Sequence, residues 1–304
     1  MKKFNILKKD FLEFLKYEKG YSNNTIQAYR RDITKFLIFL TEESVHYNKV
    51  TKETIFSFQK AFFNEFSSRT FARTISSLRS FNKYLFYKEA IDEGILTIFT
   101  DYPTPKIQKK IPSFINEEQF YKILENIEQS KKNTFQKKIE KLIIILFFTT
   151  GIRLAEASNL KLCDIFLDEK RIKVLGKGSK ERIVPINNHL KEHLIDYLKR
   201  ARKYPLKSSQ LNNNLFVDKH NKNLSRDKIQ RMVINNLKEF SVDSFGPHTL
   251  RHSFATFLLE NDVKLETVRA LLGHESIKST QIYSHVTLSS LQEAIKKAHP
   301  RGKK

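Results

Sequence analysis

The chain has few of the residues that build disulfides, metal centres or membrane spans. Its 304 residues include one cysteine, Cys163, so no internal disulfide can form, and no cysteine and histidine cluster has metal-site spacing. We expect Cys163, in an apolar stretch, to be a buried structural thiol. No apolar run approaches the ~20 residues of a membrane span, and the N-terminus lacks the apolar core of a signal peptide. These absences predict a cytoplasmic protein, not bound to a membrane, that requires no metal or redox cofactor.

Acidic residues are also few relative to basic ones. The 55 Lys and Arg against 33 Asp and Glu give a formal net charge of +22, which favours a large, negatively charged partner. A lysine-rich composition that only solvates the surface is the alternative. The length is sufficient for two domains, each with its own core.

The first hundred residues predict a small domain of four helices. Apolar residues recur at helical spacing in four stretches, at 4–18, 26–40, 51–66 and 70–88. Basic residues between the apolar stripes could contact phosphates or belong to an ordinary solvated face: Arg30, Arg31, Lys35, Arg69, Arg73, Arg79 and Lys83. The segment 101–112 holds three prolines and no apolar period, as an extended linker does. We therefore expect a helical domain over 1–100, a linker over 101–112 and a second domain over 113–304.

The sequence pattern of the second domain predicts helices around a small antiparallel sheet. Three short β-type runs, at 165–167, 171–175 and 182–185, are separated by turn residues. Helical patterns lie on both sides of them, at 116–128, 136–150, 187–203, 226–239, 248–259, 264–272 and 287–298. The expected fold class is mainly α with a small antiparallel β-sheet in the second domain.

A scattered set of side chains in this second half could perform one reaction on a phosphodiester. The set is Arg153, Lys177, His248, Arg251, His274 and Tyr283. Singly, each has an ordinary structural interpretation, such as a surface cation, a turn lysine, a cap histidine or a packed tyrosine. Together they supply a phenol as nucleophile, permanently charged guanidinium donors for the phosphate oxygens and a lysine to protonate the departing oxygen.

Four ordered sequence blocks carry a family resemblance. They are Thr150-Gly151-Ile152-Arg153-Leu154-Ala155-Glu156, Gly176-Lys177-Gly178-Ser179-Lys180-Glu181-Arg182, Pro247-His248-Thr249-Leu250-Arg251-His252, and Leu271-Leu272-Gly273-His274 followed by Thr280-Gln281-Ile282-Tyr283. They resemble the signature blocks of the tyrosine recombinases, in particular the Xer branch. The N-terminal stretch from Lys19 to Asp32 resembles the opening of that family's SAM-like core-binding domain. The resemblance therefore covers nearly the whole chain.

The resemblance implies a role for each residue of the set. Tyr283 would be the nucleophile that forms a 3′-phosphotyrosyl link. Arg153 and Arg251 would bind the scissile phosphate, and Lys177 would be the general acid. The remaining implied roles are proton transfer at the tyrosine for His248, donation to a non-bridging oxygen for His274 and orientation of Arg153 for Glu156. Ala155 stands where the family often has serine, which removes no catalytic group.

The resemblance also implies partners and an outcome. Four protomers, identical or paired with a paralogue of the XerC/XerD kind, would exchange strands of double-stranded DNA through a Holliday junction without ATP, metal or other cofactor. The biological role would be resolution of chromosome dimers at dif-like sites, with the FtsK translocase as a further partner, and the 287–298 helix would dock in trans or in cis. The alternatives are a recombinase of a mobile element or phage, a type IB topoisomerase, a DNA-binding protein that does not cut and a non-specific basic protein of the nucleoid.

Overall fold

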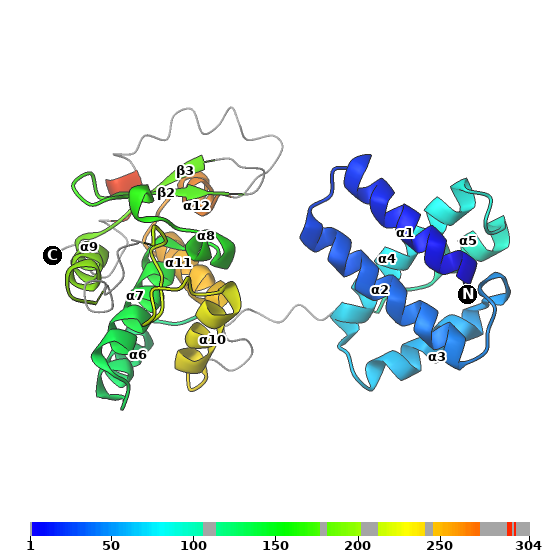
Figure 1. Ribbon diagram of the computed structural model, residues 1–304, viewed down its shortest axis with the longest axis horizontal. Helices are drawn as coiled ribbons and strands as arrows, with labels where there is room; N and C mark the ends of the chain where they lie inside the picture. The colour runs from blue at the N-terminus through cyan, green and yellow to red at the C-terminus, as the bar shows by residue number, and fades with distance from the viewer. Residues whose placement is uncertain are drawn as a thin grey trace. The chain divides into compact units, whose positions relative to one another are not determined.

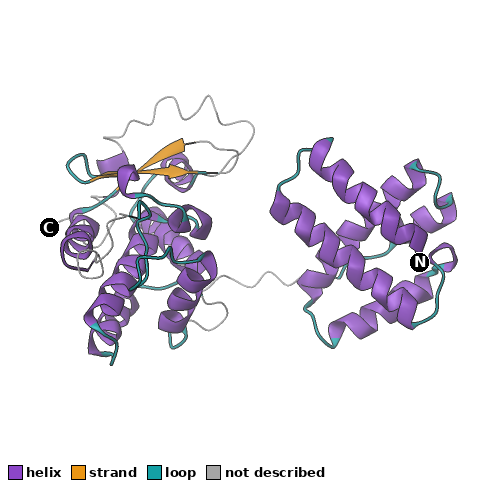
Figure 2. Ribbon diagram, in the orientation of Figure 1, coloured by secondary structure: helices purple, strands orange, loops and turns teal. Residues whose placement is uncertain are grey.

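The computed structural model describes residues 2–105, 114–176, 181–201, 212–240, 246–273, 291–293 and 295. The chain divides into two compact units, Met1–Lys110 and Ile111–Lys304 (Figure 1). Within the described residues, both units are mainly helical and the strands form one small sheet in the second unit (Figure 2). The predicted fold class is therefore confirmed.

Five α-helices build the described part of the first unit. They are α1 (Lys2–Tyr17), α2 (Asn23–Glu42), α3 (Lys52–Phe63), α4 (Ser68–Tyr87) and α5 (Glu93–Asp101), with a 3₁₀ turn at Tyr47–Lys49 between α2 and α3. Each of α2 to α5 begins after a capping side chain that accepts a backbone N–H of the first turn, namely Ser22, Thr51, Ser67 and Asp92. The prediction of four helices was wrong, because α5 has only nine residues and buries two apolar side chains, Ile95 and Phe99, too few for a visible period.

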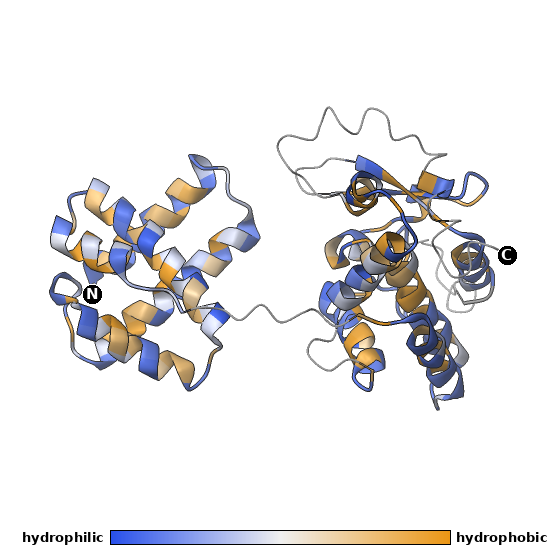
Figure 3. Cartoon of the chain, turned by 180° about the vertical axis from the view of Figure 1, so that it is seen from behind, coloured by the Kyte–Doolittle hydropathy of each residue, from blue (hydrophilic) through white to orange (hydrophobic). Residues whose placement is uncertain are grey.

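Aromatic rings form the core of the first unit. The Phe36 ring packs edge-on against Phe58 and Phe99, with centroids 5.1 and 5.5 Å apart, and the Phe11 ring lies 5.3 Å from that of Phe81. Figure 3 shows hydrophobic and hydrophilic residues alternating along these helices, the pattern expected when one face of each helix is buried.

Two arginines of this unit have internal contacts. Arg73 binds the fully buried Asp32 carboxylate at 2.8 Å and so connects α4 to α2. Arg79 donates to the carbonyl group of Phe99 in α5, at 3.0 Å, and to that of Tyr102, which follows α5, at 2.5 Å. Tyr102 is buried in the core of this unit, so the expected linker 101–112 begins inside it.

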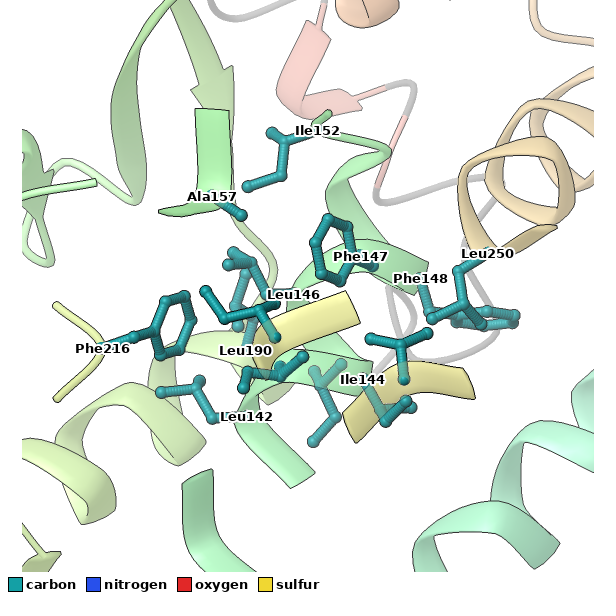
Figure 4. Close-up of a cluster of buried hydrophobic side chains, with 14 of the residues drawn as sticks. Leu142, Ile144, Leu146, Phe147, Phe148, Ile152, Ala157, Leu190, Phe216 and Leu250 are labelled. Carbon is teal, nitrogen blue, oxygen red and sulfur yellow. The ribbon is translucent and has the colours of Figure 1, made fainter. Parts of the chain in front are cut away.

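Helix α7 is the centre of the second unit. The described residues of this unit include the helices α6 (Glu117–Gln129), α7 (Thr134–Thr150), α8 (Leu154–Ser158), α9 (Asn188–Asp196), α10 (Arg226–Leu237), α11 (Pro247–Glu260) and α12 (Leu265–Leu272), and a π-helical turn, Tyr197–Ala201, follows α9. Almost every α7 residue from Ile139 to Thr150 is buried, because α6, α9, α10 and α11 pack around it. Figure 4 shows its apolar side chains converging with those of Leu190, Phe216 and Leu250.

The sheet has the predicted antiparallel form. Its strands β1 (Ile165–Phe166), β2 (Arg171–Leu175) and β3 (Glu181–Pro185) pair in the order β1-β2-β3. Ile172 pairs with Val184, and Val174 pairs with Arg182. Paired residues point to the same face of a sheet, so Arg182 lies on the face that buries Ile172, Val174 and Val184.

The expectation of a buried Cys163 was wrong, since this side chain is exposed. Cys163 lies in a 3₁₀ turn, Leu162–Asp164, in which Leu162 packs against the core. A tight turn directs successive side chains apart. Because Leu162 points toward the core, the Cys163 side chain points toward solvent.

Few residues of the 287–298 segment are described. Leu291 and Ile295 are buried in an apolar cluster with Phe254, Leu258 and Val268 of the same chain. These two side chains pack in cis, and docking of the segment in trans stays a prediction. Among the described residues, no helix is both long and apolar enough to cross a bilayer.

Candidate active site

Four of the seven predicted site residues lie in the described part of the second unit. Arg153, Glu156, His248 and Arg251 are described, whereas Lys177, His274 and Tyr283 lie outside the described residues. The four come from two places in the chain: Arg153 and Glu156 lie at the start of α8 and within it, and His248 and Arg251 lie in the first half of α11.

Gly151 sets the position of Arg153 by ending α7. It has a left-handed conformation with φ of 59°, which glycine adopts without strain. A Cβ atom here would lie 2.4 Å from Cδ1 of Phe254 and 2.8 Å from a methyl group of Leu272, so only glycine allows α11 and α12 to approach the turn this closely. The chain then turns into α8, with Arg153 as the residue before its first turn.

Glu156 holds Arg153 through both its backbone and its side chain. The Arg153 backbone N–H donates to Oε2 at 2.7 Å, and its Nη1 donates to Oε1 at 3.0 Å. The Glu156 side chain is 3% exposed. Burial alone would raise the pKa of this carboxyl, but hydrogen bonds from Arg182 and Arg153 outweigh the burial and lower the pKa. The predicted pairing of Glu156 with Arg153 is thus present, with an additional partner.

That additional partner, Arg182, was assigned no role from the sequence. Its Nη1 and Nη2 donate to Oε1 and Oε2 of Glu156 at 2.5 and 2.9 Å, the paired geometry of a guanidinium on a carboxylate. The sequence signal that could have identified Arg182 is the alternation of inward and outward residues along β3. Arg182 is in phase with Val184 on the buried face of β3, where a charge requires a partner of opposite sign.

Arg251 reaches the same place from α11. The residue is 8% exposed, and its Nη1 and Nη2 donate to the carbonyl groups of Gly151, at 2.5 Å, and Leu272, at 2.6 Å. Burial, followed by the positive charge of Arg153, lowers the pKa of Arg251 to about 10. The guanidinium therefore stays charged at neutral pH.

Three arginines converge on the end of α12. Arg182 Nε donates to the Leu271 carbonyl at 3.3 Å, Arg251 Nη2 to that of Leu272 at 2.6 Å, and Arg153 Nη2 to that of Gly273 at 2.7 Å. Helix C-termini present carbonyl groups without partners inside the helix, and cations favour this end. The contacts end one residue before His274, at the start of the sequence that leads to Tyr283.

His248 lies on α11 one turn before Arg251. It is exposed, and it follows Gly246 and Pro247 at the start of the helix. Residues three apart on a helix are neighbours on its surface, so His248 and Arg251 face the same side.

The cluster has the charge of an anion site. Arg153, Arg182 and Arg251 contribute three positive charges and Glu156 one negative charge, an excess of two. Guanidinium groups bind phosphate oxygens through paired donors, and a low-dielectric setting strengthens that attraction. The part of the chain that the structure describes contains no group of three or more His, Cys, Asp or Glu side chains that could hold a metal ion.

Comparison with protein-family models gives two matches. The model of the phage integrase family matches residues 113–289, and that of the phage integrase N-terminal SAM-like domain matches residues 9–89. The first match contains all seven predicted site residues.

Similar proteins cover almost the full chain. A tyrosine recombinase XerD of Staphylococcus saprophyticus is 36% identical over 296 residues, which are 96% of this chain and 98% of the relative. A XerD of Oceanobacillus iheyensis is 34% identical over 96% of this chain and 97% of its own length.

Solved structures show the same fold. The XerH site-specific recombinase bound to difH substrate, in a pre-cleavage complex, is 25% identical with a TM-score of 0.64, over 94% of this chain and 83% of that one. A lambda integrase dimer bound to a COC′ core site has a TM-score of 0.69 at 17% identity, over 93% of this chain and 98% of that one, which indicates the fold alone. The chain belongs to the phage integrase family, the tyrosine recombinases.

Proposed function

We propose that this site-specific tyrosine recombinase cuts and rejoins DNA with Tyr283 as its nucleophile and the arginine cluster as its phosphate site. The convergence of Arg153 and Arg251 on the end of α12 carries the proposal. It brings two guanidinium groups together beside the start of the sequence that contains His274 and Tyr283.

The proposed reaction is a transesterification. The Tyr283 hydroxyl oxygen attacks the phosphorus and forms a 3′-phosphotyrosyl bond, while the bond from phosphorus to the 5′ oxygen breaks. Lys177 gives its proton to that oxygen, His248 assists proton transfer at the tyrosine, and His274 donates to a non-bridging oxygen. Arg153 and Arg251 bind the charge that gathers on the phosphate, where one preorganised donor typically contributes about a hundred- to a thousand-fold in rate.

Rejoining reverses these steps. A 5′ hydroxyl of another strand attacks the phosphotyrosyl bond and releases the phenol, so phosphodiester energy is conserved without ATP. Exchange of strands between two sites in this way passes through a Holliday junction and uses four protomers. The protomers are copies of this chain or pairs with a paralogue.

The proposed biological role is resolution of chromosome dimers at dif-like sites in the cytoplasm. The similarity to XerD proteins over nearly the whole chain, and to a XerH that binds difH, supports this role. The helical domain over 1–100 would bind DNA beside the cut, the residues up to 112 would connect it to the catalytic domain over 113–304, and an FtsK translocase would activate the assembly.

Covalent trapping tests the chemistry. The protein is incubated with a nicked suicide duplex that carries a candidate dif-like sequence, denatured and examined for a protein–DNA adduct. We expect an adduct with the wild type and none with Tyr283→Phe, which keeps the ring but loses the nucleophilic oxygen. Tyr87→Phe, at an exposed tyrosine of the first unit, is the matched control and should form the adduct normally.

Three outcomes would contradict parts of the proposal. An adduct with Tyr283→Phe would remove Tyr283 as nucleophile. Relaxation of supercoiled DNA without exchange between paired sites would indicate a topoisomerase. Recombination at a mobile-element or phage site, with none at chromosomal dif-like sites, would replace the chromosomal role.

A further inference from the structure

Arg182 has a geometry that goes beyond a simple ion pair. We propose that Arg182 is a positioning residue for DNA cleavage, which keeps the charge of Arg153 available to the phosphate and holds the end of α12 in place. This inference rests on the proposed function, since it concerns the same phosphate site.

Glu156 is shared by two arginines. Its Oε1 atom accepts from Arg153 Nη1 at 3.0 Å and from Arg182 Nη1 at 2.5 Å. Its Oε2 atom accepts from the Arg153 backbone N–H at 2.7 Å and from Arg182 Nη2 at 2.9 Å. Arg182 therefore makes the paired side-chain contact, whereas Arg153 makes one side-chain contact and one backbone contact.

The sharing of Glu156 between two arginines affects how much positive charge remains at Arg153. Glu156 orients Arg153, but a buried carboxylate paired with Arg153 alone would neutralise the charge that a phosphate needs. The guanidinium of Arg182, 15% exposed as a side chain, balances the carboxylate. Since attraction inside a protein is weakly screened, this balance leaves the positive charge of Arg153 largely uncompensated.

Arg182 also contacts the end of α12 directly. Its Nε donates to the Leu271 carbonyl at 3.3 Å. A Cβ atom on Gly273 would lie 3.1 Å from Cδ and Nε of Arg182 and 3.2 Å from Cζ, so the glycine backbone packs on the guanidinium. The Gly273 carbonyl is in turn bound by Arg153. One side chain thus connects β3, the Glu156 carboxylate and the residue before His274.

The first experiment compares Arg182→Gln and Arg182→Lys with the wild type. Cleavage is measured in a single turnover on the suicide duplex, and DNA affinity is measured separately. We expect Arg182→Gln to cleave roughly 10- to 100-fold more slowly, as loss of an orienting partner does elsewhere, with affinity within about twofold. Arg182→Lys should recover only part of the rate, because an ammonium keeps the charge but cannot make the paired contact.

A double variant separates positioning from a merely structural role. In Arg182→Gln, the negative charge of Glu156 acts on Arg153 alone. Removing that negative charge as well should therefore raise the cleavage rate. We expect Glu156→Gln/Arg182→Gln to cleave faster than Arg182→Gln. A structural role predicts additive losses and a double variant slower than either single variant.

Arg171→Gln is the matched control. Arg171 lies in the same sheet and pairs with Glu169, which is 57% exposed, but it is out of phase with the residues on the buried face. Its removal should leave the cleavage rate unchanged.

The outcomes distinguish this inference from the proposed function. A Tyr283-dependent adduct in the wild type, with Arg182→Gln equally fast or the double variant slower than both single variants, overturns the role of Arg182 and leaves the function intact. No adduct from the wild type overturns both. If Arg182→Gln fails to fold, Arg182→Met and Glu156→Gln/Arg182→Met, which also remove the charge, replace the two glutamine variants, and the double variant is again expected to cleave faster than the single one.

Discussion

Arg153 and Arg251 donate hydrogen bonds to consecutive backbone carbonyl groups, those of Gly273 and Leu272, at 2.7 and 2.6 Å. Two arginines from separate elements are thereby placed by one helix end. Because those carbonyl groups belong to the backbone, the relative positions of the two guanidinium groups depend on how α12 ends and on how α11 packs beside α7. Changes that move the end of α12 should therefore act on both arginines together.

Replacement of either arginine by lysine tests their role at the phosphate. We expect Arg153→Lys and Arg251→Lys to slow single-turnover cleavage by roughly a hundred- to a thousand-fold while DNA affinity changes little, because the charge is kept and the paired donors are lost. Arg251→Lys should also lower the free energy of unfolding by about 1–3 kcal/mol, since a buried carbonyl group loses its donor. Cleavage at the wild-type rate by either variant would show that its guanidinium does not contact the phosphate.

Glu156→Gln should change how stability depends on pH. The pKa of Glu156 is lowered below the ordinary value of 4.5, so its ionised form stabilises the folded state above that pH. The stabilisation is lost as the pH falls through the folded pKa. Chemical unfolding of both proteins between about pH 7 and about pH 4 measures this. We expect the difference between wild type and variant to narrow at the acidic end, and a constant difference would contradict the role of the carboxylate charge.

Gly151→Ala should destabilise the second unit more than Gly20→Ala destabilises the first. Both glycines have left-handed φ values, of 59° and 64°, so each substitution carries backbone strain of about 1–2 kcal/mol. Only at Gly151 would the new methyl group meet Phe254 and Leu272, whereas Gly20 has open space. The overlap adds about 1–3 kcal/mol. Denaturant unfolding, followed for each unit's own transition, gives the two values, and equal values would contradict the tight packing around Gly151.

DNA binding should weaken steeply with salt. The net charge of +22 predicts that the protein neutralises many phosphates and releases their counterions. If about six or more phosphates are involved, affinity should fall about a thousand-fold or more between roughly 50 and 200 mM salt. Fluorescence titration of a labelled duplex over that range measures the slope. A flat response would show that the basic residues serve another purpose.

Much of the helical framework and the whole sheet follow from local sequence patterns. The apolar stripes of α2 and α4 and the turns around β2 have the periods of the structures they form, because a helix or strand with one buried face needs apolar residues at that period. The short α5 and the exposure of Cys163 were missed, since each depends on how a few side chains pack rather than on a repeat.

The helical character, the sheet and the residue types available at the site can be predicted from the amino-acid sequence, because they depend on periodicity and on ordered blocks along the chain. The packing of the folded chain brings Arg153, Arg182 and Arg251 together at the end of α12 and places Glu156 between two of them. Those contacts join residues from α8, β3, α11 and the end of α12, which span positions 153 to 273. Their distances depend on the packing of buried faces, which no spacing within one segment records.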